Sequence, residues 1–406
     1  MAVDYEILTP ETIPAYIASK PELAGIVDTT TLEVAEVGDG NLNLVFVCED
    51  ADGKGICLKQ SLPYVRLVGE AWPLTPERVI AEARGLAVAD AFTPHLVPDF
   101  YGIDEDQHVL AMENLMGWEI WRGKLNDGFI HSGVAALMGE YVANLAFHTS
   151  YFAVDQLEVK QRVAEAINPE LCQITEDLVF TEPYIEHDNN SFVDEIEAEV
   201  MALRTDTELR GEVGMLKYKF MTAAEALIHA DLHTGSVMVM TKADGSGDAR
   251  AIDPEFAYYG PVGFDLGALF GNYLAARARA EVLARPPEFR DWVGGLAQET
   301  WDAFEAETRR LWETRPYGTW TESFLDAWLA QVQEDALGFG GCKANRRIIG
   351  LAKVSDIQEL PPEEHAQAAT IVLRTASTWI KDRSRLATVA ASNEVFESVV
   401  SEVLEG

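Results

Sequence analysis

The sequence contains little cysteine. Its 406 residues include four cysteines, and these lie far apart: Cys48, Cys57, Cys172 and Cys342. Because no two of them form a Cys-x-x-Cys pair, the sequence argues against a zinc site and against a disulfide scaffold. Scattered thiols are typical of a reducing compartment, so we expect a cytoplasmic protein.

Long apolar runs are also missing. The first six residues, Met-Ala-Val-Asp-Tyr-Glu, contain neither a basic segment nor an apolar one, so we expect no signal peptide. No uncharged apolar run reaches the roughly 20 residues of a membrane span. We therefore expect no membrane partner.

Positive charge is scarce. The chain carries 31 Lys and Arg residues against 67 Asp and Glu, which gives a net charge of −36. Nucleic acids and anionic membranes are therefore poor partners. The acidic excess would either steer a cationic substrate or keep the surface soluble, and we favour solubility because the acids are spread along the chain. Any anion that binds must be met by a local group of donors.

The first part of the chain, residues 1–115, is predicted to be a strand-rich domain. Apolar and alternating runs bounded by turn residues predict strands at 33–37, 44–47, 56–60 and 108–112. One helix is expected before the last of these strands, with Thr75 as its N-cap and Pro76 at its first position.

The remainder, residues 116–406, has mainly helical periodicity. We predict helices at 133–152, 192–204, 265–279, 291–313, 322–337 and 362–381. A small antiparallel β-sheet lobe followed by a large, mainly helical lobe is the plan of a bilobal, protein-kinase-like α+β fold. We therefore predict that fold class.

A β-hairpin is predicted in the helical part. Two apolar runs, Val237 to Met240 and Ala249 to Ile252, flank the turn-forming segment Asp244 to Asp248. Asp231 precedes this hairpin, and the segment Asp253-Pro254-Glu255 follows it. Because paired strands lie roughly 5 Å apart, the open end of the hairpin should bring these acids together.

Phosphoryl transfer needs this kind of layout, in which one carboxylate orients a hydroxyl and two others hold a metal. Asp231 is the candidate catalytic residue. Asp253 and Glu255 offer hard oxygen ligands suited to Mg²⁺. Their apolar flanks predict burial, and buried carboxylates need a partner or an ion.

The strand-rich part supplies the groups that would meet a nucleotide phosphate. Gly38 and Gly40 form a turn between two strands, which allows close backbone approach. Lys59 lies at the end of the third strand, and Glu82 on the following helix would pair with it. Each signal is weak alone, and their order along the chain strengthens the prediction.

Three further residues near the acidic segments have alternative interpretations. His229 and His233 would suit zinc, but no third ligand lies at metal spacing, so we expect structural roles. Asp265 is either a helix N-cap or a buried brace for the catalytic loop.

With these residues in view, the chain resembles the S-methyl-5-thioribose kinase family, one of the aminoglycoside-phosphotransferase and choline-kinase-like small-molecule kinases. The matching segments run from about residue 33 to 356. They are 38–43, Lys59-Gln60 with Pro63-Tyr64, 68–75, 94–98, 231–236, 252–264 and 346–352. The Gly-Glu-Ala-Trp-Pro-Leu-Thr loop and the twin arginine are the segments most specific to thioribose kinases.

The resemblance implies ATP-dependent phosphorylation of the anomeric hydroxyl of methylthioribose, which gives the 1-phosphate for methionine salvage. ATP would be the co-substrate, Mg²⁺ the metal and a small sugar the partner, with a homodimer expected by family analogy. Residues 1–115 would form the ATP-binding lobe. Residues 116–406 would carry the catalytic loop, the metal site and the sugar pocket.

The resemblance also assigns residues to the nucleotide. Asn41 and Lys59 would contact ATP, and Glu82 would pair with Lys59. The backbone of Glu113, Asn114 and Leu115 would meet adenine as the hinge. The segment Asp253-Pro254-Glu255 would lie at the phosphates, where Asp253 and Glu255 would hold Mg²⁺.

On the sugar side, Asp231 would meet the acceptor hydroxyl, and Trp72 would lie on the loop that closes the pocket. Arg346 and Arg347 would neutralise the transferred phosphoryl group. Guanidinium groups suit phosphate oxygens, and the apolar continuation Ile348-Ile349 places at least one arginine near buried surface.

Three departures from the family pattern stand out. Ala230 occupies a position that is usually glycine. Ser236 stands where most related kinases place a metal-binding asparagine, although thioribose kinases share the serine. The segment Met116 to Arg122 differs from the usual sequence after the hinge and would reshape the nucleotide or sugar pocket.

Several alternatives remain open from the sequence. The acceptor would be 5-deoxyribose if the pocket does not select the methylthio group. An aminoglycoside kinase fits less well, because its polycationic substrate calls for carboxylates where arginines are predicted. An ATP-binding pseudokinase would lack the lysine, the catalytic aspartate or the metal acids, and all three are present.

Overall fold

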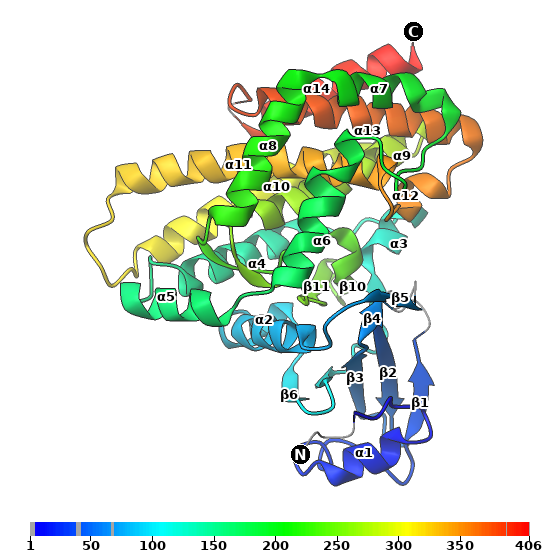
Figure 1. The fold of residues 1–406 in the computed structure, drawn as a ribbon, viewed down its shortest axis with the longest axis vertical. Helices are drawn as coiled ribbons and strands as arrows, with labels where there is room; N and C mark the ends of the chain where they lie inside the picture. The colour runs from blue at the N-terminus through cyan, green and yellow to red at the C-terminus, as the bar shows by residue number, and fades with distance from the viewer. Residues whose placement is uncertain (1–4, 38–41, 66–68, 387, 406) are drawn as a thin grey trace.

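The computed structural model describes residues 5–37, 42–65, 69–386 and 388–405. A small antiparallel sheet lies at one end of the molecule, and a large helical lobe forms the remainder (Figure 1). The predicted α+β fold class is therefore confirmed. Among the described residues, no helix is both long and apolar enough to cross a membrane.

The small lobe is a five-stranded sheet in the order β1-β2-β3-β7-β6. Its strands are β1 (Glu33–Glu36), β2 (Asn43–Glu49), β3 (Gly55–Ser61), β7 (Val109–Glu113) and β6 (Phe100–Asp104). Helix α1 (Ile13–Ser19) covers the sheet and buries Ile13 against Phe46 and Leu58. The four predicted strands are present. The sequence did not predict β6 or the small ribbon of β4 (Tyr64–Val65) and β5 (Gly69–Pro73).

The predicted start of the first large helix is wrong by two residues. Helix α2 (Arg78–Phe92) has Glu77 at its N-cap position, without a side-chain cap, in place of Thr75. The first turn instead starts with the Val79 N–H donating to the Pro76 oxygen at 3.3 Å, while the Thr75 oxygen accepts from the Arg78 guanidinium at 2.7 Å.

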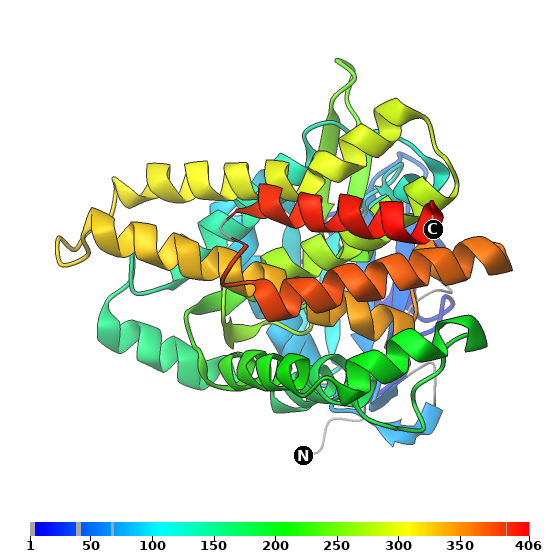
Figure 2. The ribbon, with the colours of Figure 1, turned by 90° about the horizontal axis from the view of Figure 1, so that it is seen from above.

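The large lobe contains the six predicted helices and several others. Its helices are α3 (Trp121–Asp127), α4 (Val134–Thr149), α5 (Gln156–Glu165), α6 (Pro169–Phe180), α7 (Glu197–Thr205), α8 (Thr207–Thr222), α9 (Gly263–Val282), α10 (Pro287–Trp312), α11 (Glu322–Ile349), α12 (Ser355–Gln358), α13 (Pro362–Asp382) and α14 (Val389–Leu404). Seen from above, the long helices α10, α11, α13 and α14 run side by side (Figure 2).

Helix α11 continues twelve residues beyond its predicted end at Leu337, and this extension carries the twin arginine. Glycines at 338, 340 and 341 follow the predicted end, and in the structure they permit close helix packing. A Cβ atom on Gly267 of α9 would lie 2.8 Å from the backbone nitrogen of Gly340, and one on Gly271 would lie 2.6 Å from the Gly340 oxygen. Glycine is therefore required on α9 for α11 to pack closely against it.

The predicted hairpin is confirmed as β10 (Val237–Thr241) paired with β11 (Gly247–Ala251). A second ladder joins β9 (Ala226–Ile228) to β12 (Tyr258–Gly260). The segments 229–236 and 252–257 lie between these two ladders. Each pairing holds the same two stretches of chain together, so the two acidic segments lie side by side, as predicted from the hairpin.

The chain enters the large lobe soon after β7. Strand β8 (Glu119–Ile120) already pairs with β10, so the segment between Glu113 and Glu119 links the two lobes. The domain boundary at residue 115 falls in this segment and stays a prediction.

Candidate active site

Lys59 joins the two lobes through its ammonium group. Its Nζ donates to Glu82 Oε1 of α2 at 2.8 Å and to Asp253 Oδ1 of the large lobe. Burial would lower the pKa of Lys59, but the carboxylates of Asp253 and Glu82 outweigh that effect and raise it. Lys59 is therefore a buried, permanently charged group, and its predicted pairing with Glu82 is found.

Glu255 is also buried and is held by the small lobe. Asn43 Nδ2 donates to Glu255 Oε2 at 2.7 Å, and Arg78 Nε lies 3.4 Å from the same oxygen. Burial raises the pKa of Glu255. The sequence predictions did not include Arg78 or Asn43, although an arginine in the first turn of a helix beside the sheet was a usable signal.

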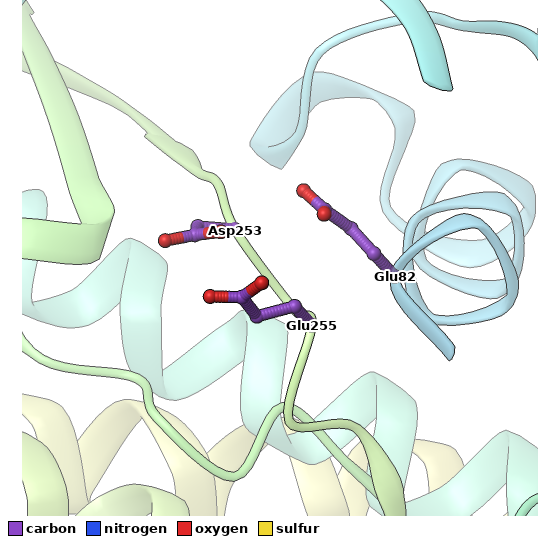
Figure 3. Close-up of side chains that lie close together, drawn as sticks. All are labelled: Glu82, Asp253 and Glu255. Atoms are coloured by element: carbon purple, nitrogen blue, oxygen red, sulfur yellow. The ribbon is translucent and has the colours of Figure 1, made fainter. Parts of the chain in front are cut away.

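Three carboxylates converge where the lobes meet. Glu82, Asp253 and Glu255 each offer an oxygen within 4.8 Å of the others, and Figure 3 shows Glu82 reaching from α2 toward the other two. Carboxylate oxygens are the ligands that Mg²⁺ prefers. The residues therefore fit the predicted metal, and Glu82 is an additional candidate ligand.

Two non-glycine residues in this region have left-handed backbone geometry. Ala230 has φ +64° and Asp253 has φ +69°. Such conformations cost on the order of 1–3 kcal/mol and persist where the surroundings impose them. Alanine at position 230, in place of the usual glycine, thus leaves the loop in the conformation that glycine would adopt. The alanine backbone is strained there.

Asp265 imposes the conformation of the catalytic loop. Its carboxylate accepts from the backbone N–H of His229 at 2.7 Å and from that of Ala230 at 2.8 Å. The side chain is 1% exposed. Of the two alternatives for Asp265, the buried brace is the one that the structure shows.

Replacing Asp265 by asparagine should therefore destabilise the loop. An amide accepts through one oxygen only, so one backbone N–H would face an NH₂ group and lose its partner, at a cost of about 1–3 kcal/mol. Chemical denaturation measures the loss in the free energy of unfolding. Asp244→Asn is the control, because Asp244 accepts two hydrogen bonds from Ser246 in an exposed turn. Equal stability of the two variants would contradict the bracing role.

Both histidines form hydrogen bonds within the acidic segments, and their structural role stays a prediction. His229 Nε2 lies 2.9 Å from the Ile252 carbonyl oxygen and links the two acidic segments. His233 Nδ1 accepts from Gly235 N–H at 3.1 Å, with Ser236 Oγ at 3.2 Å. Burial lowers the pKa of His233 well below its usual value, although the nearby Asp231 carboxylate opposes that shift. In the described ranges, the candidate metal cluster contains neither histidine.

Asp231 forms an ion pair with a buried lysine that the sequence did not predict. Lys343 of α11 donates to Asp231 Oδ1 at 2.6 Å, and His233 Nε2 lies 3.5 Å from Oδ2. Burial opposes ionisation of Asp231, but Lys343, His233, Arg347 and Arg346 together hold its pKa well below the usual value. The candidate catalytic group is therefore a carboxylate.

The twin arginine lies beside this pair at the end of α11. The Nε atoms of Arg346 and Arg347 are buried and have no hydrogen-bond partner among the described residues. Arg122 of α3 adds a third guanidinium, which donates to Asn272 at 2.7 Å and lies 3.4 Å from Asp356. Guanidinium groups gathered in this way suit the oxygens of a phosphate.

One usable signal for Lys343 was present in the sequence. It lies three and four residues before the twin arginine, so all three cations share one region of the helix surface. Its neighbours from 336 to 344 are small or apolar. A lysine in that setting must find a partner. Arg122, by contrast, falls in the segment that departs from the family pattern.

The remaining predicted site residues are placed as follows. Glu113 ends β7, where its backbone N–H donates to the Asp99 carbonyl oxygen and its side chain accepts from the Asp99 N–H, while Asn114 packs against Gly55. Pro254 packs against Gly85 of α2. Leu115 lies between β7 and β8.

Four of the predicted residues lie wholly or partly outside the described part of the chain. Asn41 and the glycines at 38 and 40 lie outside the described residues, as does the side chain of Trp72. The backbone of Trp72 belongs to β5. Their assigned roles stay predictions.

Curated relatives match most of the chain. A methylthioribose kinase of Geobacillus sp. (strain WCH70) is 40% identical over 376 residues, which cover 91% of each chain. Those of Yersinia enterocolitica and Citrobacter koseri are 41% and 42% identical over 353 and 352 residues, covering 84% of this chain and 86% of each relative. No family model matches the chain.

Solved structures of small-molecule kinases are more distant. A glucosamine kinase in complex with glucosamine, ADP and inorganic phosphate has a TM-score of 0.44 at 15% identity, covering 98% of this chain and 86% of its own. A Plasmodium vivax ethanolamine kinase has a TM-score of 0.44 at 13% identity, with coverages of 98% and 93%.

Proposed function

The chain belongs to the methylthioribose kinase family, and we propose from this that it transfers the γ-phosphoryl group of ATP to the anomeric hydroxyl of S-methyl-5-thio-D-ribose. The product is the 1-phosphate, an intermediate of methionine salvage. One observation of this structure carries the proposal. The ionised Asp231 lies among the buried cations of α11, on a loop that runs beside the Asp253 segment.

The nucleotide side is formed by both lobes. Lys59 would neutralise ATP phosphates, with Glu82 holding its ammonium in place. Asp253 and Glu255 would hold Mg²⁺, which neutralises charge on the phosphates when bound. Asn41 and the hinge of Glu113, Asn114 and Leu115 would meet the nucleoside.

On the acceptor side, Asp231 would receive a hydrogen bond from the anomeric hydroxyl and aim it at the γ-phosphoryl group. Because cations hold the pKa of Asp231 far below neutrality, its role is orientation more than early proton abstraction. A loose phosphoryl-transfer transition state needs little covalent assistance, so orientation suffices. Arg346 and Arg347 would neutralise the phosphoryl oxygens, and Trp72 would close the sugar pocket.

A parallel acceptor assay tests this function. Purified protein with ATP and Mg²⁺ is offered methylthioribose, 5-deoxyribose, choline and kanamycin. We expect kcat/KM to be highest for methylthioribose, with little turnover of choline or kanamycin. A clear preference for 5-deoxyribose would replace the proposed substrate with the alternative sugar. Turnover of kanamycin without any sugar phosphorylation would overturn the sugar-kinase proposal.

By analogy with related kinases we also propose a homodimer. A solution mass near twice the chain mass of 44.8 kDa supports it, and a mass near 44.8 kDa contradicts it.

A further inference from the structure

We propose that Lys343 is a positioning residue of the acceptor site, whose ammonium group fixes the Asp231 carboxylate in the orientation that receives the acceptor hydroxyl. This inference rests on the proposed kinase function, because it assigns a supporting group to its candidate catalytic residue. Neither the motif sequence nor the spacing of the acidic segments indicated it.

The contact geometry allows little freedom to the carboxylate. Lys343 Nζ lies 2.6 Å from Asp231 Oδ1, while His233 Nε2 faces Oδ2 at 3.5 Å. Each carboxylate oxygen thus has its own neighbour. Rotation of the Asp231 side chain would break the charge-assisted hydrogen bond, which is among the stronger kinds in proteins.

Burial of the pair is asymmetric. The Lys343 side chain is 3% exposed, whereas that of Asp231 is 21% exposed. The Lys343 ammonium also lies over the Phe264 ring, 4.8 Å from its centre. The lysine therefore supports the carboxylate from within the core and leaves part of Asp231 open to an acceptor. A purely structural ion pair has no need of this arrangement.

The position of Lys343 depends on the packing of α11 against α9. Close approach of the two helices at Gly267 and Gly271 sets the position of α11 relative to α9. Arg346 and Arg347 lie one turn further along the same helix. One rigid element therefore places the support for Asp231 and the two candidate phosphoryl-binding cations together.

The charges around the pair fix its expected pH behaviour. The charged and titratable neighbours of Asp231 are Lys343, His233, Arg346 and Arg347, while Lys343 also faces Asp265. Lys343 is the largest of the influences that favour the ionised form of Asp231. Burial outweighs the opposing effect of Asp231 and lowers the pKa of Lys343 itself to about 8.

The decisive variant is Lys343→Met in the full chain, which keeps a long apolar stem and removes the charge. We expect kcat to fall about 10- to 100-fold, as for other supporting contacts of reactive groups. The KM for ATP should stay within about threefold of wild type, because the nucleotide groups are untouched. Lys219→Met is the matched control. Lys219 of α8 forms an ion pair with Asp335, which lies on α11 as Lys343 does.

The pH profile separates positioning from a general structural role. Without Lys343 the pKa of Asp231 rises. As the pH falls, Asp231 is therefore protonated, and activity lost, at a less acidic pH than in wild type. The acid limb of kcat/KM should therefore move upward in Lys343→Met and remain in place in Lys219→Met. A structural defect alone would lower the whole profile without moving this limb.

A double variant gives a second, independent readout. If Lys343 acts through Asp231, Asp231→Asn with Lys343→Met should lose no more activity than Asp231→Asn alone. Additive losses, or wild-type kcat and an unmoved acid limb in Lys343→Met, would overturn the inference. If Lys343→Met fails to fold, Lys343→Gln replaces it, because glutamine keeps a hydrogen-bond donor without the charge. The same changes in kcat and in the acid limb are expected, and the same results would overturn the inference.

The wild-type assay distinguishes failure of this inference from failure of the proposed function. If wild type phosphorylates another acceptor in preference to methylthioribose, the proposed substrate fails, and the same variants measured with that acceptor still test Lys343. If wild type phosphorylates no acceptor, both proposals are overturned.

Discussion

Asp231→Asn should reduce kcat for phosphoryl transfer by about 10²–10⁴-fold, the range typical of losing a positioned acid–base group. The amide keeps the size of the side chain but cannot form the ion pair with Lys343, and it offers the acceptor hydroxyl a weaker hydrogen-bond acceptor. ATP should still bind, because Lys59 and Asp253 remain. Steady-state kinetics and nucleotide titration measure the two effects separately.

The control for this variant is Asp244→Asn in the exposed hairpin turn, which should retain wild-type kcat. Unchanged turnover in Asp231→Asn would remove Asp231 from the mechanism. A loss of ATP affinity that matches the loss in kcat would place Asp231 at the nucleotide instead of the acceptor.

Asp253→Asn is expected to have the second largest effect, a loss in kcat/KM of about a hundredfold or more. The substitution replaces one of three converging carboxylates with a neutral amide and removes the negative charge that pairs with Lys59. A bound metal contributes several kcal/mol of charge stabilisation in such reactions, and each 1.36 kcal/mol corresponds to a tenfold change in rate.

The diagnostic measurement is the Mg²⁺ dependence of the rate. Asp253→Asn should need a higher Mg²⁺ concentration for half-maximal activity than wild type does. Asp244→Asn in the exposed hairpin turn is the control and should keep the wild-type Mg²⁺ dependence. An unaltered Mg²⁺ dependence in Asp253→Asn would contradict its assignment as a metal ligand.

The fold was predictable where sequence signals were local. The hairpin was found because two apolar runs flank a glycine-containing turn, and this pattern depends on neighbouring residues alone. The end of α11 was missed because glycines near 340 usually interrupt helices. Here they permit close contact with α9, which is a tertiary effect that no local pattern reports.

The candidate site was predictable in its acidic segments and not in its cations. Asp231 and Asp253 belong to short motifs joined by one hairpin, so their proximity followed from strand pairing. Lys343 lies 112 residues beyond Asp231 and reaches it only through the packing of α9 and α11. Asp265 was ambiguous for the same reason, since a brace and an N-cap look alike in sequence.

The most direct test of the proposed mechanism is a crystal structure with methylthioribose, Mg²⁺ and a non-hydrolysable ATP analogue. The anomeric hydroxyl should lie about 2.6–3.2 Å from the Asp231 carboxylate. Asp253 should contact the metal, and Lys343 should remain on Asp231. A sugar bound with that hydroxyl directed away from Asp231, or a metal held without Asp253, would contradict the central claim.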